Sequence, residues 1–195
     1  MNKLIDFKLI EEAKLKLEPL LSPTPLHYAS NLSRIFGAEI YLKLECFQPI
    51  KVFKIRGAYN KILNLSDQER KKGLVTASSG NHGIAVSYVA NKLNLNSIVC
   101  LPEGANPSKV NQIKKFGAKI VQEGENYDDS YKNAIQIVSD NQSTLVHPFN
   151  DPLVIAGQGT IGLELIEQLP TLNTVIVPIG GGGLISGISL ALKHF

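Results

Sequence analysis

The sequence of 195 residues predicts an α/β protein built on open parallel sheets, and three observations support that prediction. From Leu74 onward, short apolar runs alternate with helical patterns, which is typical of parallel strands joined by right-handed crossovers. Two polar or glycine-rich motifs each follow a strand-like run and open a helical one. A lysine, Lys54, stands where another irregular segment becomes helical. Because open parallel sheets bind ligands at such junctions, we expect the three to face one crevice.

The spacing of apolar residues and the positions of proline and glycine predict the elements that precede and include Lys54. In chain order these are a docking helix over 5–18 that ends at Pro19, a short helix over 32–36 closed by Gly37, a strand over 40–45 that is half exposed on one face, a loop over 45–51, and a helix over 56–65.

Ser66 opens a capping-box match for a short helix that ends at Gly73, and the pattern becomes regular after this glycine. The elements expected next are strand 74–77, helix 82–93, strand 97–101, helix 107–116, strand 118–121, helix 127–140, strand 144–146, helix 152–168, buried strand 174–177 and helix 184–193. The predicted division of the chain is 1–72 as the first part of a large lobe, 73–147 as a small α/β lobe, and 148–195 as the return to the large lobe, with a crossing at 147–152.

Composition excludes several classes of partner. Hydrophobic residues make up 44% of the chain, enough for a real core. The 20 basic and 17 acidic residues are scattered, so no stripe for nucleic acid is expected. Cys46 and Cys100 lack metal-ligand spacing and a disulfide-dense context, so we expect reduced thiols, no metal site and a cytoplasmic protein. Charges interrupt residues 1–21 every few positions, so neither a signal peptide nor a membrane partner is expected.

Lys54 is the first candidate for chemistry. Phe53 and Ile55 flank it, and an apolar setting disfavours the ammonium form of lysine. The neutral amine can attack an aldehyde, so Lys54 is a candidate imine-forming lysine. The alternative is an ordinary lysine whose stem lies along the surface while its charge stays in water.

Two downstream motifs favour the first interpretation. The four glycines Gly180, Gly181, Gly182 and Gly183 precede a helix, so their N–H groups and those of Leu184 can converge on a phosphate. The run lacks the Walker lysine and the spacing of a dinucleotide fingerprint, which indicates a phosphate other than that of a nucleoside triphosphate. A flexible glycine turn is the alternative.

The second motif, Ser78-Ser79-Gly80-Asn81-His82-Gly83, follows the strand expected over 74–77. Its hydroxyls, amide and backbone donors suit a substrate carboxylate or a phenolic oxygen. A plain turn with helix-capping serines is the alternative. A histidine at a helix start more often packs than acts as a base, so His82 receives no catalytic role.

Five motifs, in this order and spacing, resemble those of one enzyme family. They are Phe53–Ala58, Ser79–Gly83, His147–Phe149, Ile155–Thr160 and Pro178–Gly187. Together they resemble the threonine/serine dehydratases, also called threonine ammonia-lyases, and their relative serine racemase, over Thr24 to Phe195. These are fold-type II pyridoxal-phosphate enzymes, so the resemblance implies a two-lobed, tryptophan synthase β-like architecture and pyridoxal 5'-phosphate as cofactor.

The resemblance also implies residue roles. Lys54 would bind the cofactor's aldehyde and, once released by substrate, take the α-proton. Phe53 would pack beside the cofactor ring, Asn81 would bond its ring oxygen, and Gly180–Leu184 would hold its phosphate. Ser79 would help seat the substrate carboxylate, and Ser78, Gly80, Asn81 and His82 would belong to the same substrate-binding loop. In racemizing relatives the serine matching Ser79 is a second base.

The implied reaction converts L-threonine or L-serine to a 2-oxo acid and ammonia. A serine racemase-like activity is the alternative within the enzymes. A non-catalytic remnant that binds the cofactor or a partner chain is the alternative outside them. An assay for D-serine against pyruvate separates the first two.

The sequence departs from the family pattern in two places. Ile50-Lys51-Val52 stands where the family has threonine-glycine-serine, which leaves the substrate preference open. Family members also continue well beyond Phe195, so we expect a C-terminally incomplete fold whose sheet has an unpaired edge at 174–177. Such a chain is expected to be completed by a further segment or another polypeptide, or to form a homo-oligomer.

Overall fold

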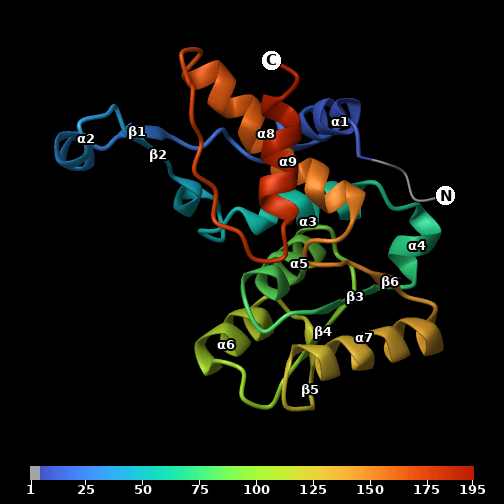
Figure 1. Ribbon diagram of the computed structural model, residues 1–195. Helices are drawn as coiled ribbons and strands as arrows, with labels where there is room; N and C mark the ends of the chain where they lie inside the picture. The colour runs from blue at the N-terminus through green and yellow to red at the C-terminus, as the bar shows by residue number, and fades with distance from the viewer. Residues whose placement is uncertain (1–4) are drawn as a thin grey trace.

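The computed structural model describes residues 5–195 and shows two lobes (Figure 1). Helices α1 (Phe7–Leu17), α8 (Pro152–Gln168) and α9 (Gly183–Leu192) form the upper lobe in that view, and the lower lobe holds a parallel sheet. Helix α3 (Lys54–Leu63) lies between them, in contact with both α8 and α5 (Asn81–Lys92). The two-lobed α/β architecture is therefore confirmed, while the residue limits given for the lobes stay a prediction.

The sheet of the lower lobe has four parallel strands in the order β5-β4-β3-β6. The strands are β3 (Leu74–Ala77), β4 (Ser97–Leu101), β5 (Lys119–Gln122) and β6 (Thr144–Leu145). Helix α7 (Tyr127–Asn141) packs on one face, while α5 and α6 (Pro107–Lys115) pack on the other. All four residues of β3 are buried, as expected for a central strand covered on both faces.

Local signals in the sequence explain most helix ends. Ser66 and Glu69 form the predicted capping box of α4 (Asp67–Lys71). Asn106 caps α6 just before a proline at its first turn, and Asp151 does the same for α8. Gly37 adopts a left-handed conformation, with φ of +64°, and ends α2 (Ser30–Phe36) as predicted.

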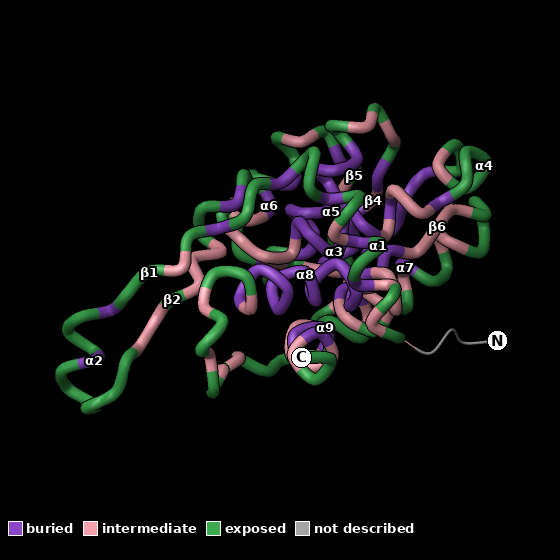
Figure 2. Tube along the Cα trace, turned by 90° about the horizontal axis from the view of Figure 1, so that it is seen from above, coloured by how far each residue is buried: buried purple, intermediate pink, exposed green. Residues whose placement is uncertain are grey.

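Helix α8 is buried over most of its length, as Figure 2 shows at the centre of the molecule. Glycines make this close packing possible. A Cβ atom at Gly157 would lie 2.6 Å from the carbonyl oxygen of Arg56, and one at Gly187 would lie 2.4 Å from that of Ile155. The backbones of α3 and α9 therefore approach α8 at distances that no larger residue allows.

A projecting arm precedes the site. Strands β1 (Leu26–Tyr28) and β2 (Tyr41–Lys43) pair in an antiparallel ribbon that ends in the exposed helix α2 (Figure 2). The short 3₁₀ helix η1 (Glu45–Phe47) follows. In β2 the apolar Leu42 faces outward, at 41% exposure, whereas the side chain of Lys43 is only 10% exposed. Lys43 lies inward because its amine pairs with a buried glutamate, described below.

The buried strand predicted over 174–177 is wrong. This segment is irregular, and Ile176 is 94% exposed, although Val175 and Val177 pack in part against α8 and α9. Within residues 5–195 no neighbouring strand supplies partners for its backbone groups, and a strand needs those partners to form. The described chain therefore contributes an apolar extended segment here, not a second parallel sheet.

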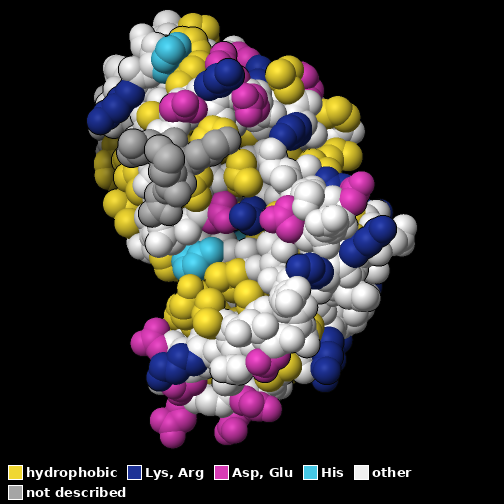
Figure 3. Space-filling view, turned by 90° about the vertical axis from the view of Figure 1, so that its right-hand side faces the viewer, with side chains coloured by type: hydrophobic (Ala, Val, Ile, Leu, Met, Phe, Trp, Pro, Cys, Tyr) yellow, Lys and Arg dark blue, Asp and Glu magenta, His cyan; other side chains and the backbone are white. Residues whose placement is uncertain are grey.

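None of the helices within residues 5–195 combines the length and the apolar character that crossing a bilayer requires. On the face shown in Figure 3, basic and acidic side chains are interspersed over both lobes. The surface is indented between the two lobes on the left-hand side of that view.

Candidate active site

The segment Val146–Phe149 touches the starts of three helices. The carbonyl oxygen of Val146 lies 3.0 Å from Nε2 of His82, in the first turn of α5. The carbonyl oxygen of Pro148 accepts a hydrogen bond of 2.7 Å from Nζ of Lys54, the first residue of α3. Lys54 therefore meets the loop Ser78–Gly83, called the serine-asparagine loop below, at this segment, although the two are far apart in sequence.

Phe149 packs against the segment Gly180–Leu184, called the glycine-rich loop below, and so brings it to the segment Val146–Phe149. A Cβ atom at Gly181 would lie 2.3 Å from the aromatic ring of Phe149, and one at Gly183 would lie 2.9 Å from its carbonyl oxygen. Gly183 is the first residue of α9. The structure therefore gathers the starts of α3, α5 and α9 around four consecutive residues.

The amine of Lys54 lies in a partly apolar setting. Burial lowers the pKa of Lys54 from its ordinary value of 10.5. The amine also lies 5.4 Å from the centre of the Phe53 ring. Lys54 consequently has a larger neutral, nucleophilic fraction near neutral pH than an exposed lysine has.

The glycine-rich loop presents free backbone donors. In the part of the chain that the structure describes, the N–H groups of Gly180–Leu184 donate no hydrogen bond. A Cβ atom at Gly180 or Gly182 would meet no atom within 4 Å, and Gly182 has a φ of +84°. Unpaired donors with open space before them, at the start of a helix, suit an anion such as a phosphate.

The serine-asparagine loop offers side chains on the surface. Ser79 and Asn81 are exposed, and Oδ1 of Asn81 accepts a hydrogen bond of 2.9 Å from Lys109. That contact leaves the amide nitrogen of Asn81 as a donor for another group. Oγ of Ser78 accepts a bond of 3.3 Å from the N–H of Gly80, so this hydroxyl shapes the turn.

His82 is a packed, neutral residue. Only 2% of it is exposed, and burial lowers its pKa to about 3. A neutral imidazole that donates from Nε2 to the Val146 carbonyl explains its position at the helix start. That His82 has no catalytic role stays a prediction.

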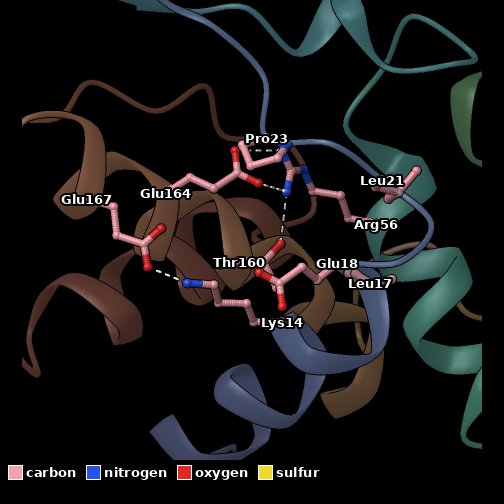
Figure 4. Close-up of a pocket in the computed structure, with 9 residues that line it drawn as sticks. All are labelled: Lys14, Leu17, Glu18, Leu21, Pro23, Arg56, Thr160, Glu164 and Glu167. Carbon is pink, nitrogen blue, oxygen red and sulfur yellow. Dashed lines mark hydrogen bonds and ion pairs between the residues drawn. The ribbon is translucent and has the colours of Figure 1, made fainter.

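A buried ionic cluster that lies next to Lys54 in the chain was not predicted from the sequence. Arg56 is 2% exposed and donates two hydrogen bonds of 2.8 Å to Glu45 and bonds of 2.5 and 3.0 Å to Glu164. It also donates a bond of 3.1 Å to Thr160. Figure 4 shows the guanidinium between Glu164 and Thr160, beside a small pocket of about 60 Å³. The cluster fastens α3, the segment before it and α8 together.

Lys43 completes the cluster from the arm. Its amine lies 2.5 Å from Oε2 of Glu164 and donates a bond of 2.7 Å to the carbonyl oxygen of Thr24. One feature of the sequence could have indicated the ionic cluster, because Glu164 is the only charged residue in the apolar run 153–165. Charged residues are rarely buried without partners, so an isolated one in a buried helix indicates a paired cation.

A partly buried amine and a loop of unpaired backbone donors, held at one segment of an α/β fold, are suited to a phosphorylated aldehyde. Comparison with known proteins identifies the family. Residues 17–195 match the model of the family described as "Pyridoxal-phosphate dependent enzyme". The chain belongs to this family.

The chain is 48% identical over 184 residues to an L-threonine ammonia-lyase of Thermotoga maritima, covering 94% of this chain and 46% of that protein. It is 45% identical over 187 residues to the L-threonine dehydratase catabolic TdcB of Staphylococcus aureus, covering 95% and 54%. The structure of maize serine racemase superimposes with a TM-score of 0.94 at 38% identity, covering 97% and 58%. The chain therefore spans about half the length of the curated relatives it matches.

Proposed function

We propose that this chain forms the cofactor-binding part of a pyridoxal-phosphate-dependent ammonia-lyase that converts L-threonine or L-serine to a 2-oxo acid and ammonia. One observation supports this most directly. The partly buried amine of Lys54 is held at 2.7 Å from the Pro148 carbonyl, in the segment whose Phe149 packs against the glycine-rich loop. A reactive amine and a phosphate-binding loop are thereby fixed to one short stretch of chain.

The residues present fit the cofactor. When bound, pyridoxal phosphate supplies an aldehyde and a conjugated ring that withdraws electrons from the substrate's α-carbon. The N–H groups of Gly180–Leu184 would hold its phosphate, and Phe53 would pack beside its ring. The free amide nitrogen of Asn81 would donate to the ring oxygen, and the hydroxyl of Ser79 would donate to the substrate carboxylate.

Lys54 would move the protons of the reaction. Its neutral amine accepts the proton from the α-carbon of the substrate. The resulting ammonium can return that proton to the departing β-hydroxyl, which leaves as water. The unsaturated amine that is released then takes up water and yields the 2-oxo acid and ammonia.

The names of the relatives favour threonine as the substrate, with serine second. Threonine would give 2-oxobutanoate, for use in threonine breakdown or isoleucine biosynthesis, and serine would give pyruvate. We place this chemistry in the cytoplasm. We further propose that the site is completed by a segment beyond this sequence or within a homo-oligomer, because the relatives are about twice as long.

A serine racemase activity is the second candidate, and the similarity to maize serine racemase favours it. The exposed hydroxyl of Ser79, in the loop before α5, is available as a second base. Incubation with L-serine separates the two: the lyase yields pyruvate, and the racemase yields D-serine.

The proposal is tested by titrating pyridoxal phosphate into the chain. We expect a visible absorbance band that borohydride removes, with the label recovered on the peptide that contains Lys54. The Lys54→Ala variant should lack the band, whereas Lys132→Ala, a change at an exposed lysine on α7, should retain it. Equal labelling of both variants would contradict the proposal, and a band without turnover would favour a binding role.

A further inference from the structure

We propose that His147 is a positioning residue for Lys54 and for the glycine-rich loop. Through Nδ1 it holds Val146–Phe149 in the shape that directs the Pro148 carbonyl at the Lys54 amine and the Phe149 ring at Gly181. The catalytic consequence rests on the proposed function, whereas the positioning itself can be measured without cofactor.

The imidazole of His147 closes a tight turn. Its Nδ1 accepts a hydrogen bond of 2.8 Å from the N–H of Asn150 and one of 3.2 Å from the N–H of Phe149. An asparagine or aspartate side chain makes the same kind of turn when it accepts from backbone two and three residues ahead. Because two donors point at Nδ1, this nitrogen carries no proton.

Two aromatic neighbours pack against the imidazole ring of His147. Tyr131 of α7 meets the imidazole of His147 edge-on, with ring centres 5.7 Å apart, and Phe149 does so at 4.7 Å. The turn is thereby held against the lower lobe. Burial and the nearby charge of Lys54 lower the pKa of His147 more than Asp151 raises it, so the imidazole remains a neutral acceptor.

The turn controls two contacts of the site. Pro148 lies inside it, between the acceptor and its donors, and its carbonyl oxygen accepts the 2.7 Å bond from Lys54. Phe149 supplies one of the two donors, and its ring occupies the space that a Cβ atom at Gly181 would need. Loss of the Nδ1 bonds would therefore release the partner of the amine and the support of the loop together.

A matched pair of variants isolates the acceptor. In His147→Asn the amide oxygen can stand where Nδ1 stands, whereas His147→Leu keeps a side chain of similar size without an acceptor. In the full chain without cofactor, we expect the amides of Phe149 and Asn150 to exchange hydrogen about tenfold faster in the leucine variant. The asparagine variant should exchange like the parent.

A second readout follows the amine. Competitive labelling over a range of pH should show the pKa of Lys54 rising toward 10.5 in His147→Leu, because the amine gains water, and staying unchanged in His147→Asn. A role in packing alone would affect both variants equally, and that result would overturn the proposal. Unchanged exchange at Phe149 and Asn150 in the leucine variant would also overturn it.

Failure of the proposed function gives a different result. If the two variants differ in exchange while the parent binds no pyridoxal phosphate, the positioning role stands and the proposed function fails. If the parent binds the cofactor through Lys54 but the variants agree with one another, the positioning role fails alone. Should His147→Leu not fold, judged by the exchange of β3 and β4, His147→Gln replaces it, since its acceptor lies at the position of Nε2.

Discussion

Arg56 and Glu164 are joined by two hydrogen bonds, of 2.5 and 3.0 Å, between α3 and α8. Because Lys54 begins α3, this pair fixes the helix that presents the proposed catalytic amine. Glu45, which Arg56 also binds, lies in the segment that leads to Lys54. The orientation of the amine therefore depends on charges that lie outside the site.

Arg56→Met should destabilise the chain strongly. Removing one partner of a buried ion pair leaves uncompensated charge, here mainly on Glu45 because Lys43 still pairs with Glu164, and costs about 3–5 kcal/mol. Urea unfolding followed by circular dichroism measures the loss in free energy of unfolding. Arg34→Met, at an exposed arginine of α2, is the control and should change stability by less than about 0.5 kcal/mol. Equal effects of the two changes would contradict the importance of the cluster.

Stability should fall in acid through Glu164. Burial alone would raise the pKa of Glu164, but hydrogen bonds and attraction from Arg56 and Lys43 outweigh burial and hold it below 4.5. A carboxyl group with a lowered pKa in the folded state stabilises that state above its unfolded pKa, and the contribution disappears as the pH falls through the folded value. The free energy of unfolding should therefore decrease below about pH 4.5, with a shallower slope in Glu164→Gln. An unchanged slope in this variant would assign the acid sensitivity to other groups.

Gly181→Ala should disturb the glycine-rich loop, because its Cβ would lie 2.3 Å from the Phe149 ring. Overpacking of this kind typically costs about 1–3 kcal/mol. Gly180→Ala is the matched control for stability, since a Cβ there meets no atom within 4 Å. Thermal unfolding of the two variants measures the difference, and equal melting temperatures would show that Phe149 moves aside without cost.

Gly157→Ala should be more damaging, because its Cβ would meet backbone atoms of Arg56 and Gly57 at 2.6 and 2.7 Å. Backbone cannot rotate away as a side chain can, so α3 and α8 must separate, at a cost of about 3 kcal/mol. In an open helix position the same change would gain about 1 kcal/mol. Gly104→Ala, in open space on a turn, is the control. A Gly157→Ala chain as stable as the parent would show that the helices have room to spare.

The strands and helices of the lower lobe could be predicted from the sequence because their signals are local. Each strand and helix there has its own apolar spacing and its own punctuation, such as Gly73, Gly117 and the Asn106-Pro107 start of α6. The segment 174–177 has the same apolar character, but apolar character does not supply a neighbouring strand. Its failure to pair depends on the surrounding chain, which the local pattern does not contain.

The candidate site, like the fold, could be predicted from the sequence only where its features are local. Lys54 and the glycine-rich loop could be singled out because their chemistry is concentrated in short motifs. The cluster of Arg56 and the turn of His147 could not, because they depend on geometry. Arg56 and Glu164 are 108 residues apart, and the acceptor role of His147 depends on the conformation of three following residues.

Lys54, Asn81 and Gly183 share one property: each is the first residue of a helix. The aligned peptide dipoles of a helix place about half a positive charge at its start. Three such ends around Val146–Phe149 create a field that opposes protonation of the amine and attracts phosphate and carboxylate groups alike. Because this field arises from the backbone, it does not change with pH. The attraction for anions should therefore weaken with added salt but persist at pH values where side chains change their charge.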